Sequence, residues 1–266
     1  MREFQFHRPA TVADALGLIK KLPQGKFLGG GQSLLPVLKL EMAEPSDLIS
    51  LAAIRELHGI RVEKDQVIIG AGTRHAEVAA SPEVRKAIPG LAKLAEGIGD
   101  PQVRNRGTIG GSLAHADPAA DYPAAVLALG ATIRTDRRTI AADDFFTGLF
   151  ETSLGEGELI TAVSFPIPTR SAYAKFASHA SKYALVGVMV AQTAHGIRVA
   201  VTGAGPKAFR VPAMEAALKA SFAPGAVSQI RVPADELSDS AEASADYRSH
   251  IITVMAERAV AASLAG

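Results

Sequence analysis

The stretch Phe27-Leu28-Gly29-Gly30-Gly31-Gln32-Ser33 runs from an apolar strand end into three glycines and two side chains that can form hydrogen bonds. A second stretch, Thr108-Ile109-Gly110-Gly111-Ser112, repeats these ingredients further along the chain. Glycine has no Cβ atom, so the backbone can turn tightly there and bring successive N–H groups close to an anion. Two such stretches predict a diphosphate-containing ligand held by two glycine-rich loops.

Neither stretch is the fingerprint of a nicotinamide-dinucleotide fold, which needs a third glycine at a fixed spacing. Leu34 stands in that position after Gly29 and Gly31, and His75 stands there after Gly70 and Gly72. The sequence contains no P-loop either. A dinucleotide held by two separate glycine loops, rather than by one helix N-terminus, therefore favours another kind of fold.

The residues around the first stretch predict alternating strands and helices. Residues 3–7 alternate as in a strand, and Thr11 is an N-cap candidate for a helix that ends before a strand at 26–28. A strand, a helix and a strand within so few residues predict a parallel pair joined by a right-handed crossover. Ser33 begins a second helical stretch, and a short strand follows at 47–51.

The proline pair Pro166 and Pro168 is the strongest candidate for a domain boundary. Before it, the pattern predicts a helix at 81–96, with Pro89 as a kink or break, a glycine-rich turn at 107–112 and a helix at 121–129. It also predicts strands at 60–62, 67–70, 131–134, 140–141 and 158–165. After it, the pattern predicts an antiparallel meander of strands 173–178, 184–193 and 197–202, followed by helices 212–220 and 246–264.

The composition bounds the function. The 28 lysines and arginines nearly balance the 27 aspartates and glutamates, which excludes a nucleic-acid interface or a polybasic membrane patch as the main role. The absence of cysteine excludes disulfides, thiol catalysis and any iron–sulfur cluster held in the usual way by this chain. No apolar run approaches the ~20 residues that span a bilayer, and the first residues lack a signal-peptide core, so we expect a cytoplasmic protein.

Two patterns near the second glycine stretch indicate weaker alternatives. His115, Asp117 and Asp121 could supply metal ligands, but such clusters more often order a polar loop, so we predict no metal site. The segment Gly110-Gly111-Ser112-Leu113-Ala114 lacks the last glycine of a nucleophile elbow, which makes a serine hydrolase a weak competitor.

A resemblance to a known family rests on two blocks, GGGQSLLP at 29–36 and IGDPQVRNRGTIGGSLAHADPAAD at 98–121. Through these blocks the sequence resembles the FAD-binding medium subunit of molybdenum hydroxylases, the family of carbon monoxide dehydrogenase, xanthine dehydrogenase and aldehyde oxidoreductases. The likeness covers nearly the whole chain, because residues 173–176, 183–187 and 244–248 also match the family's carboxy-terminal flavoprotein domain.

The resemblance implies an α+β fold with two domains. Residues 1–168 would form an FAD-binding domain of the vanillyl-alcohol-oxidase type (PCMH-type), made of two α+β subdomains at about 1–57 and 58–168. Residues 169–266 would form a smaller carboxy-terminal flavoprotein domain with a three-stranded antiparallel sheet and helices.

The resemblance also implies which residues meet FAD. The family's two FAD loops correspond to 29–36 and 108–112, Asp121 matches an acid that meets the cofactor, and Ile98 and Ile160 match apolar contacts at the flavin. Lys175 matches a lysine near the flavin and Tyr183 an aromatic residue close to the ring face. The implied cofactor-binding residues are Gly29, Gly30, Gly31, Gln32, Ser33, Leu34, Leu35, Pro36, Ile98, Thr108, Ile109, Gly110, Gly111, Ser112, Asp121, Ile160, Lys175 and Tyr183.

In this family, substrate is oxidised at a molybdopterin cofactor in a large subunit, and electrons pass through the [2Fe-2S] clusters of a small subunit to FAD in the medium subunit. The resemblance therefore implies partners, arranged as a dimer of heterotrimers, and an external acceptor for the electrons. It implies no catalytic residue in this chain for the organic substrate. The lack of cysteine agrees, because the clusters must then lie in another chain.

Lys175 is expected to tune the flavin through charge. A lysine about 4 Å from the negative charge of reduced flavin, at an effective dielectric constant of ~20, would contribute about 4 kcal/mol in favour of the anionic form. His179 and Lys182 depart from the family pattern, which often has basic residues after the Lys-Phe pair and an acid before the Tyr-Ala pair.

Two other interpretations stay open. The chain could be a self-sufficient FAD-dependent oxidase or dehydrogenase, or a scaffold subunit that has lost its flavin; the two intact glycine stretches argue against the scaffold. The sequence does not specify the organic substrate, nor whether NAD, oxygen, a quinone or a carrier protein takes the electrons.

Overall fold

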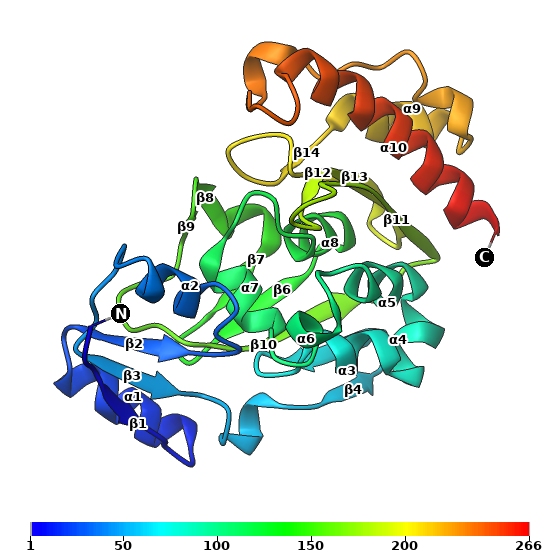
Figure 1. Ribbon diagram of the computed structural model, residues 1–266. Helices are drawn as coiled ribbons and strands as arrows, with labels where there is room; N and C mark the ends of the chain where they lie inside the picture. The colour runs from blue at the N-terminus through cyan, green and yellow to red at the C-terminus, as the bar shows by residue number, and fades with distance from the viewer. Residues whose placement is uncertain (1, 266) are drawn as a thin grey trace.

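A small parallel sheet opens the fold in the computed structural model, which describes residues 2–265 (Figure 1). Thr11 caps the first helix, since its hydroxyl accepts a hydrogen bond from the Asp14 N–H at 3.1 Å. The sheet has the order β1-β3-β2 and comprises β1 (Gln5–His7), β3 (Asp47–Ser50) and β2 (Gly25–Leu28), with helices α1 (Val12–Lys21) and α2 (Leu34–Lys39). The predicted direct pairing of the first two strands is wrong, because β3 lies between them and pairs in parallel with both.

The second sheet is antiparallel and has the order β4-β5-β10-β6-β7. Its strands are β4 (Ile60–Glu63), β5 (Gln66–Gly70), β10 (Ile160–Pro166), β6 (Thr132–Thr135) and β7 (Thr139–Ala141), and a separate hairpin pairs β8 (Phe146–Gly148) with β9 (Glu151–Thr152). Its helices are α3 (His75–Ala80), α4 (Pro82–Ala87), α5 (Pro89–Glu96), α6 (Pro101–Arg104), α7 (Ile109–His115) and α8 (Tyr122–Leu129).

The helix expected at 81–96 is broken at Pro89, as predicted. Pro89 has no N–H and disfavours the helical conformation of the residue before it. Ile88 accordingly leaves the helical region and separates α4 from α5. The glycine-rich turn predicted at 107–112 is wrong for its last four residues, because Ile109 to Ser112 form the first turn of α7.

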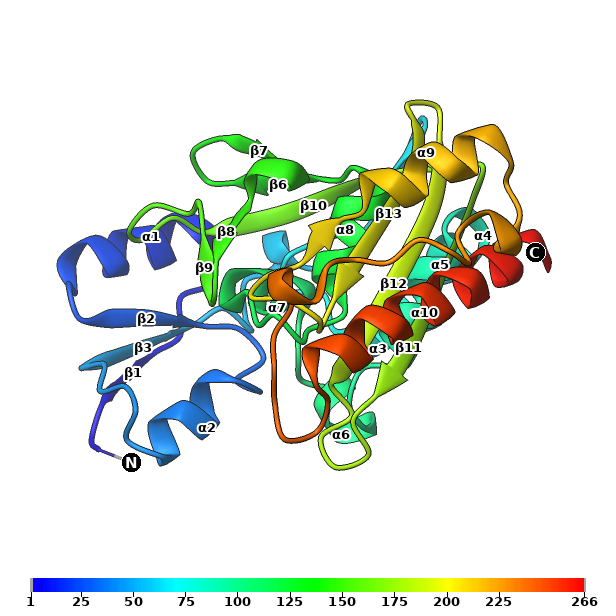
Figure 2. The same cartoon turned by 90° about the horizontal axis from the view of Figure 1, so that it is seen from above.

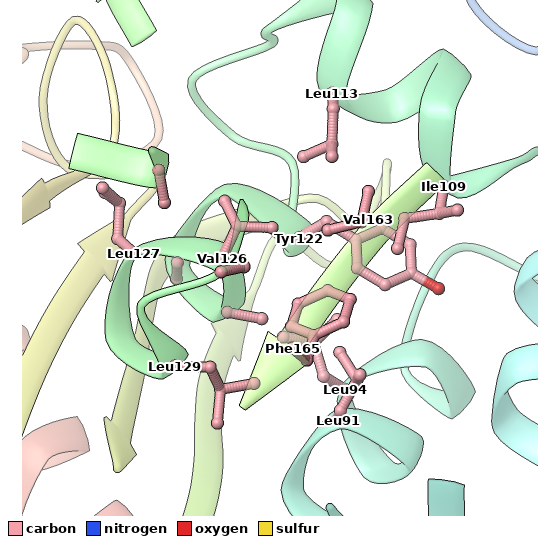
Figure 3. Packing of buried hydrophobic residues seen from close by; sticks show 14 of the residues in the cluster. Leu91, Leu94, Ile109, Leu113, Tyr122, Val126, Leu127, Leu129, Val163 and Phe165 are labelled. Carbon is pink, nitrogen blue, oxygen red and sulfur yellow. The ribbon is translucent and has the colours of Figure 1, made fainter. Parts of the chain in front are cut away.

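The main core lies between β10 and helices α5, α7 and α8. All eight residues of α8 are buried, so this helix is apolar on every side rather than along one stripe. Figure 3 shows Leu91 and Leu94 of α5, Ile109 and Leu113 of α7, and Tyr122 and Val126 of α8 converging around Val163 and Phe165 of β10.

The third sheet has the antiparallel order β11-β12-β13-β14. The three predicted strands are confirmed as β11 (Arg170–Ala177), β12 (Ala184–Thr193) and β13 (Gly196–Thr202), with the short β14 (Phe209–Arg210) added at the edge. Both faces of the sheet are buried. Met189 and Ala191 belong to the main core with α8, whereas Val188 and Val190 pack in a second core with the last helices.

The last helices cover the outer face of the third sheet. They are α9 (Pro212–Ala220) and α10 (Ala245–Ala265), and short 3-10 turns occur at Arg55–Leu57, Ala142–Asp144, Pro224–Ala226 and Ala234–Glu236. Figures 1 and 2 place the first sheet at one end of the molecule and α9 and α10 at the other. None of the helices between residues 2 and 265 is long and apolar enough to cross a bilayer.

Candidate functional site

A cleft of about 900 Å³ separates the first sheet from the rest of the chain and is lined by both glycine stretches. Pockets of this size take small-molecule and cofactor ligands. The sequence-predicted residues that line it are Gly29, Gly30, Gly31, Gln32, Ser33, Leu34, Ile98, Thr108, Gly111, Ser112, Asp121 and Tyr183. The fold therefore brings together residues from three distant parts of the sequence.

The other sequence-predicted residues lie outside the lining of this cleft. Ile109 is fully buried in the main core, and a Cβ on Gly110 would lie 2.6 Å from the Cβ of Ala71. Ile160 and Gly110 line a smaller pocket of about 130 Å³, which shares Gly29, Gly30, Thr108 and Gly111 with the cleft. Leu35 packs against Gly31, and Pro36 is exposed on α2. Lys175 forms an ion pair with Asp121.

The two glycine stretches touch each other directly. A Cβ atom on Gly30 would lie 2.1 Å from the carbonyl oxygen of Arg106 and 2.6 Å from the Cα of Gly107. A Cβ on Gly29 would lie 3.1 Å from the hydroxyl of Thr108. Glycine is thus required at position 30 because the two backbones approach too closely for any side chain.

The two stretches differ in their free hydrogen-bond donors. The N–H groups of Ile109, Gly110 and Ser112 donate to carbonyl oxygens at 2.8 to 3.1 Å, and the Gly111 N–H donates to the Thr108 hydroxyl at 3.1 Å. By contrast, none of the N–H groups from Gly29 to Ser33 has an acceptor within residues 2–265. Successive unpaired N–H groups beside a cleft suit the phosphates of a dinucleotide, so the first stretch fits FAD.

The second stretch offers fewer unpaired donors than the first. Thr108 is the N-cap of α7. Its hydroxyl accepts the hydrogen bond of the Gly111 N–H, a group that the glycine pattern predicted to bind an anion. A Cβ on Gly111 would meet only that hydroxyl, at 2.9 Å. The second stretch therefore forms a side-chain-poor wall of the cleft, in which the N–H groups of Ile109 to Ser112 are already paired.

Asp121 is the buried acid of the cleft and is held from both sides. Its Oδ1 accepts a hydrogen bond from the Tyr173 hydroxyl at 2.5 Å, and its Oδ2 lies 3.0 Å from the Lys175 Nζ. Lys175 also donates to the carbonyl oxygen of Gly97 at 3.1 Å. Burial raises the pKa of Asp121, and Lys175 and Tyr173 oppose that rise by stabilising the carboxylate. Any effect of Lys175 on a flavin would therefore pass through this pair.

His75 lines the cleft and was not recognised from the sequence as a site residue. It is 5% exposed, its ring lies 5.4 Å from that of Tyr122, and its Nδ1 has no partner among residues 2–265. Burial lowers the pKa of His75 to about 4, and the positive charge of Arg104 contributes to the decrease. The imidazole is therefore neutral at physiological pH. No local pattern distinguishes this histidine from a surface one.

Acid should destabilise the protein through His75. Its pKa is lowered in the folded state, so between about pH 6.5 and 4 the unfolded chain binds a proton that the folded chain does not. The stabilisation present above pH 6.5 is lost as the pH falls through this window, by up to about 3 kcal/mol. Denaturant titrations at pH 7 and pH 4.5 should show this slope in the wild type and a smaller slope in His75→Gln. Equal slopes in the wild type and in His75→Gln would contradict the assignment of this acid sensitivity to His75.

Glu158 also reaches the cleft but is committed to structure. Its carboxylate accepts hydrogen bonds from Arg138 at 3.0 Å, from Thr135 at 2.7 Å and from the Gly155 N–H at 2.7 Å. The hydrogen bond from Arg138 is the main reason why the pKa of Glu158 falls to about 2. A carboxylate that is ionised and fully bonded is a poor proton acceptor at neutral pH.

Four positively charged side chains line the cleft. The sequence did not predict them as site residues, because each is a single exposed residue with no motif around it. They are Lys20, Lys26, Arg137 and Lys182. Their charge suits an anionic ligand. His115 and Asp117 also line the cleft. Within residues 2–265, no group of three or more His, Cys, Asp or Glu side chains is arranged to hold a metal ion.

Comparisons with known proteins agree with this geometry. The family described as "FAD binding domain in molybdopterin dehydrogenase" matches residues 2–168. The carbon monoxide dehydrogenase medium chain of Hydrogenophaga pseudoflava is 37% identical, over 98% of this chain and 97% of the relative. The nicotine 6-hydroxylase medium subunit of Paenarthrobacter nicotinovorans is 40% identical, over 82% of this chain and 80% of the relative.

Solved structures resemble the whole chain. The structure of Hydrogenophaga pseudoflava carbon monoxide dehydrogenase superposes with a TM-score of 0.89 at 37% identity, over 99% of this chain and 98% of that one. Quinoline 2-oxidoreductase from Pseudomonas putida 86 superposes with a TM-score of 0.89 at 28% identity, over 100% of this chain and 98% of that one. The α+β fold class expected from the sequence is confirmed. The chain therefore belongs to the molybdopterin dehydrogenase FAD-binding family, as a flavoprotein medium subunit of the molybdenum hydroxylases.

Proposed function

We propose that this chain binds FAD in the 900 Å³ cleft, with the phosphates at the N–H groups of Gly29 to Ser33. The observation that carries the proposal is the row of unpaired N–H groups at the first stretch beside the cleft, whereas the N–H groups of Ile109 to Ser112 already donate within the chain. Of the sequence-predicted contacts, we keep the residues that line the cleft as cofactor contacts. Ile109, which is fully buried, then supports the wall from behind.

When bound, FAD supplies a carrier that takes up electrons singly and gives them to one- or two-electron acceptors. The residues of this chain bind and orient it. Asp121 presents a fixed carboxylate, and Tyr183, which is 42% exposed, also lines the cleft.

We further propose that the electrons come from the iron–sulfur clusters of a small subunit, after substrate oxidation in a molybdenum-containing large subunit. The lack of cysteine in this chain supports an external donor. The names of its relatives, a carbon monoxide dehydrogenase and a nicotine 6-hydroxylase, support a complex without specifying its substrate here. A dimer of heterotrimers, a cytoplasmic location and a division of the chain at residue 168 are parts of the same proposal.

Purification of the complex from its native cell tests this function. We expect one FAD per copy of this chain, with molybdenum and iron present in the complex. Gly111→Val should leave the complex assembled but poor in flavin, because the added side chain would narrow the cleft beside Thr108. The control is Gly225→Val, at an exposed glycine with nothing within 4 Å of its Cβ position.

The same preparation separates the competing interpretations. Substrate turnover by the isolated chain would support a self-sufficient flavin enzyme. A complex that stays free of flavin in saturating FAD would support a scaffold subunit and contradict the proposal.

A further inference from the structure

The segment that leads into Asp121 is held by the third sheet. The Thr202 hydroxyl lies 2.9 Å from the Pro118 carbonyl oxygen and 2.6 Å from that of Ala120. The Gly203 N–H donates to the Pro118 carbonyl at 2.7 Å, and the Ala184 N–H donates to the Ala119 carbonyl at 3.2 Å. The sheet therefore fixes the backbone just before the acid that lines the cleft.

The side chain of Asp121 is fixed by the same sheet. Tyr173 and Lys175 stand two residues apart on β11, so both point to one face and reach the two carboxylate oxygens. Burial and the neighbouring carboxylate raise the pKa of Tyr173 well above its usual value. Its hydroxyl therefore stays protonated and donates to Asp121.

Gly187 makes room for this arrangement. It lies on β12 opposite Lys175, and a Cβ there would fall 2.1 Å from the Tyr173 hydroxyl oxygen. Any other residue would displace the phenol from its path to Asp121. The segments 173–176 and 183–187, which carry part of the family resemblance, are thereby joined in one physical unit.

We propose that Tyr173 is a positioning residue, whose hydroxyl sets the direction in which Asp121 presents its carboxylate to the cofactor. Lys175 compensates the charge of Asp121, whereas Tyr173 supplies a short, directional hydrogen bond. The third sheet, remote in sequence from the glycine stretches, thus completes the FAD site. This inference rests on the proposed binding of FAD in the cleft.

The test compares Tyr173→Phe with the wild type in the assembled complex. Phenylalanine keeps the ring and removes the hydroxyl, so we expect the FAD dissociation constant to rise about tenfold, the typical effect of losing one hydrogen bond to a charged group. The midpoint potential of the bound flavin should also shift, which a purely structural role would not cause. Tyr247→Phe is the control, because Tyr247 is 43% exposed and its hydroxyl has no hydrogen-bond partner among residues 2–265.

A double-mutant cycle tests whether Tyr173 acts through Asp121. In an Asp121→Asn background, Tyr173→Phe should change FAD affinity much less than in the wild type. Gly187→Ala, on the neighbouring strand, should displace the Tyr173 hydroxyl from Asp121 and so also weaken FAD binding. The test therefore does not depend on the folding of a single variant.

Wild-type affinity and potential in Tyr173→Phe, or an equal loss in both backgrounds, would overturn the positioning role. If wild-type protein itself bound no FAD, the proposed function would fail instead, so the two failures are distinguishable.

Discussion

Replacing Gly30 with alanine should cost the protein both its stability and its ability to retain FAD. The new Cβ would lie 2.1 Å from the carbonyl oxygen of Arg106, so one of the two backbones must move. Overpacking of this kind costs about 3 kcal/mol. Denaturant unfolding should show the loss of stability, and flavin content after gel filtration should fall with it, because both walls of the cleft are displaced.

Two glycine variants serve as controls for Gly30→Ala. Gly17 lies inside α1 with nothing within 4 Å of its Cβ position, so Gly17→Ala should stabilise the protein by about 1 kcal/mol. Gly111→Ala should cost only about 1 kcal/mol, through its contact with the capping hydroxyl of Thr108, and should still reduce FAD retention. If Gly30→Ala were as stable as Gly17→Ala, the close contact between the two stretches would be wrong.

Breaking the buried pair of Asp121 and Lys175 should be equally severe. Lys175→Met leaves the Asp121 carboxylate without its positively charged partner, at a position where the Asp121 side chain is only 5% exposed. Removing one partner of a buried ion pair costs about 3–5 kcal/mol. We expect a loss of this size in the free energy of unfolding of the full chain, and the double variant Asp121→Asn/Lys175→Met should recover most of it.

The same variants show how Lys175 affects the flavin. A lysine that acts alone would shift the flavin midpoint potential strongly when removed, whereas a lysine compensated by Asp121 should shift it less than its charge alone predicts. An unchanged potential in Lys175→Met would remove Lys175 from any redox role. A full recovery of stability without any recovery of FAD binding would be consistent with Asp121 as a cofactor contact.

Much of the local structure could be read from the sequence. Thr11, Pro89 and the alternating segments of the third sheet act through neighbouring residues, by capping, by loss of an N–H, or by the period of two along a strand. The glycine stretches, which both line the cleft, could be found for the same reason. Missing Cβ atoms are visible in the sequence, and their effect on the backbone is local.

The sequence alone therefore determined most of the local elements, the family and the chemical class of the ligand, but not the helix that begins at Ile109. The tertiary structure decided that β3 lies between β1 and β2, and that the N–H groups of Ile109 to Ser112 are already occupied. It also decided that Tyr173 and Lys175 meet Asp121. The physical reason is that strand order and hydrogen-bond partners are set by contacts between residues far apart in the chain, and no local periodicity records which distant group will occupy a given donor or compensate a given charge.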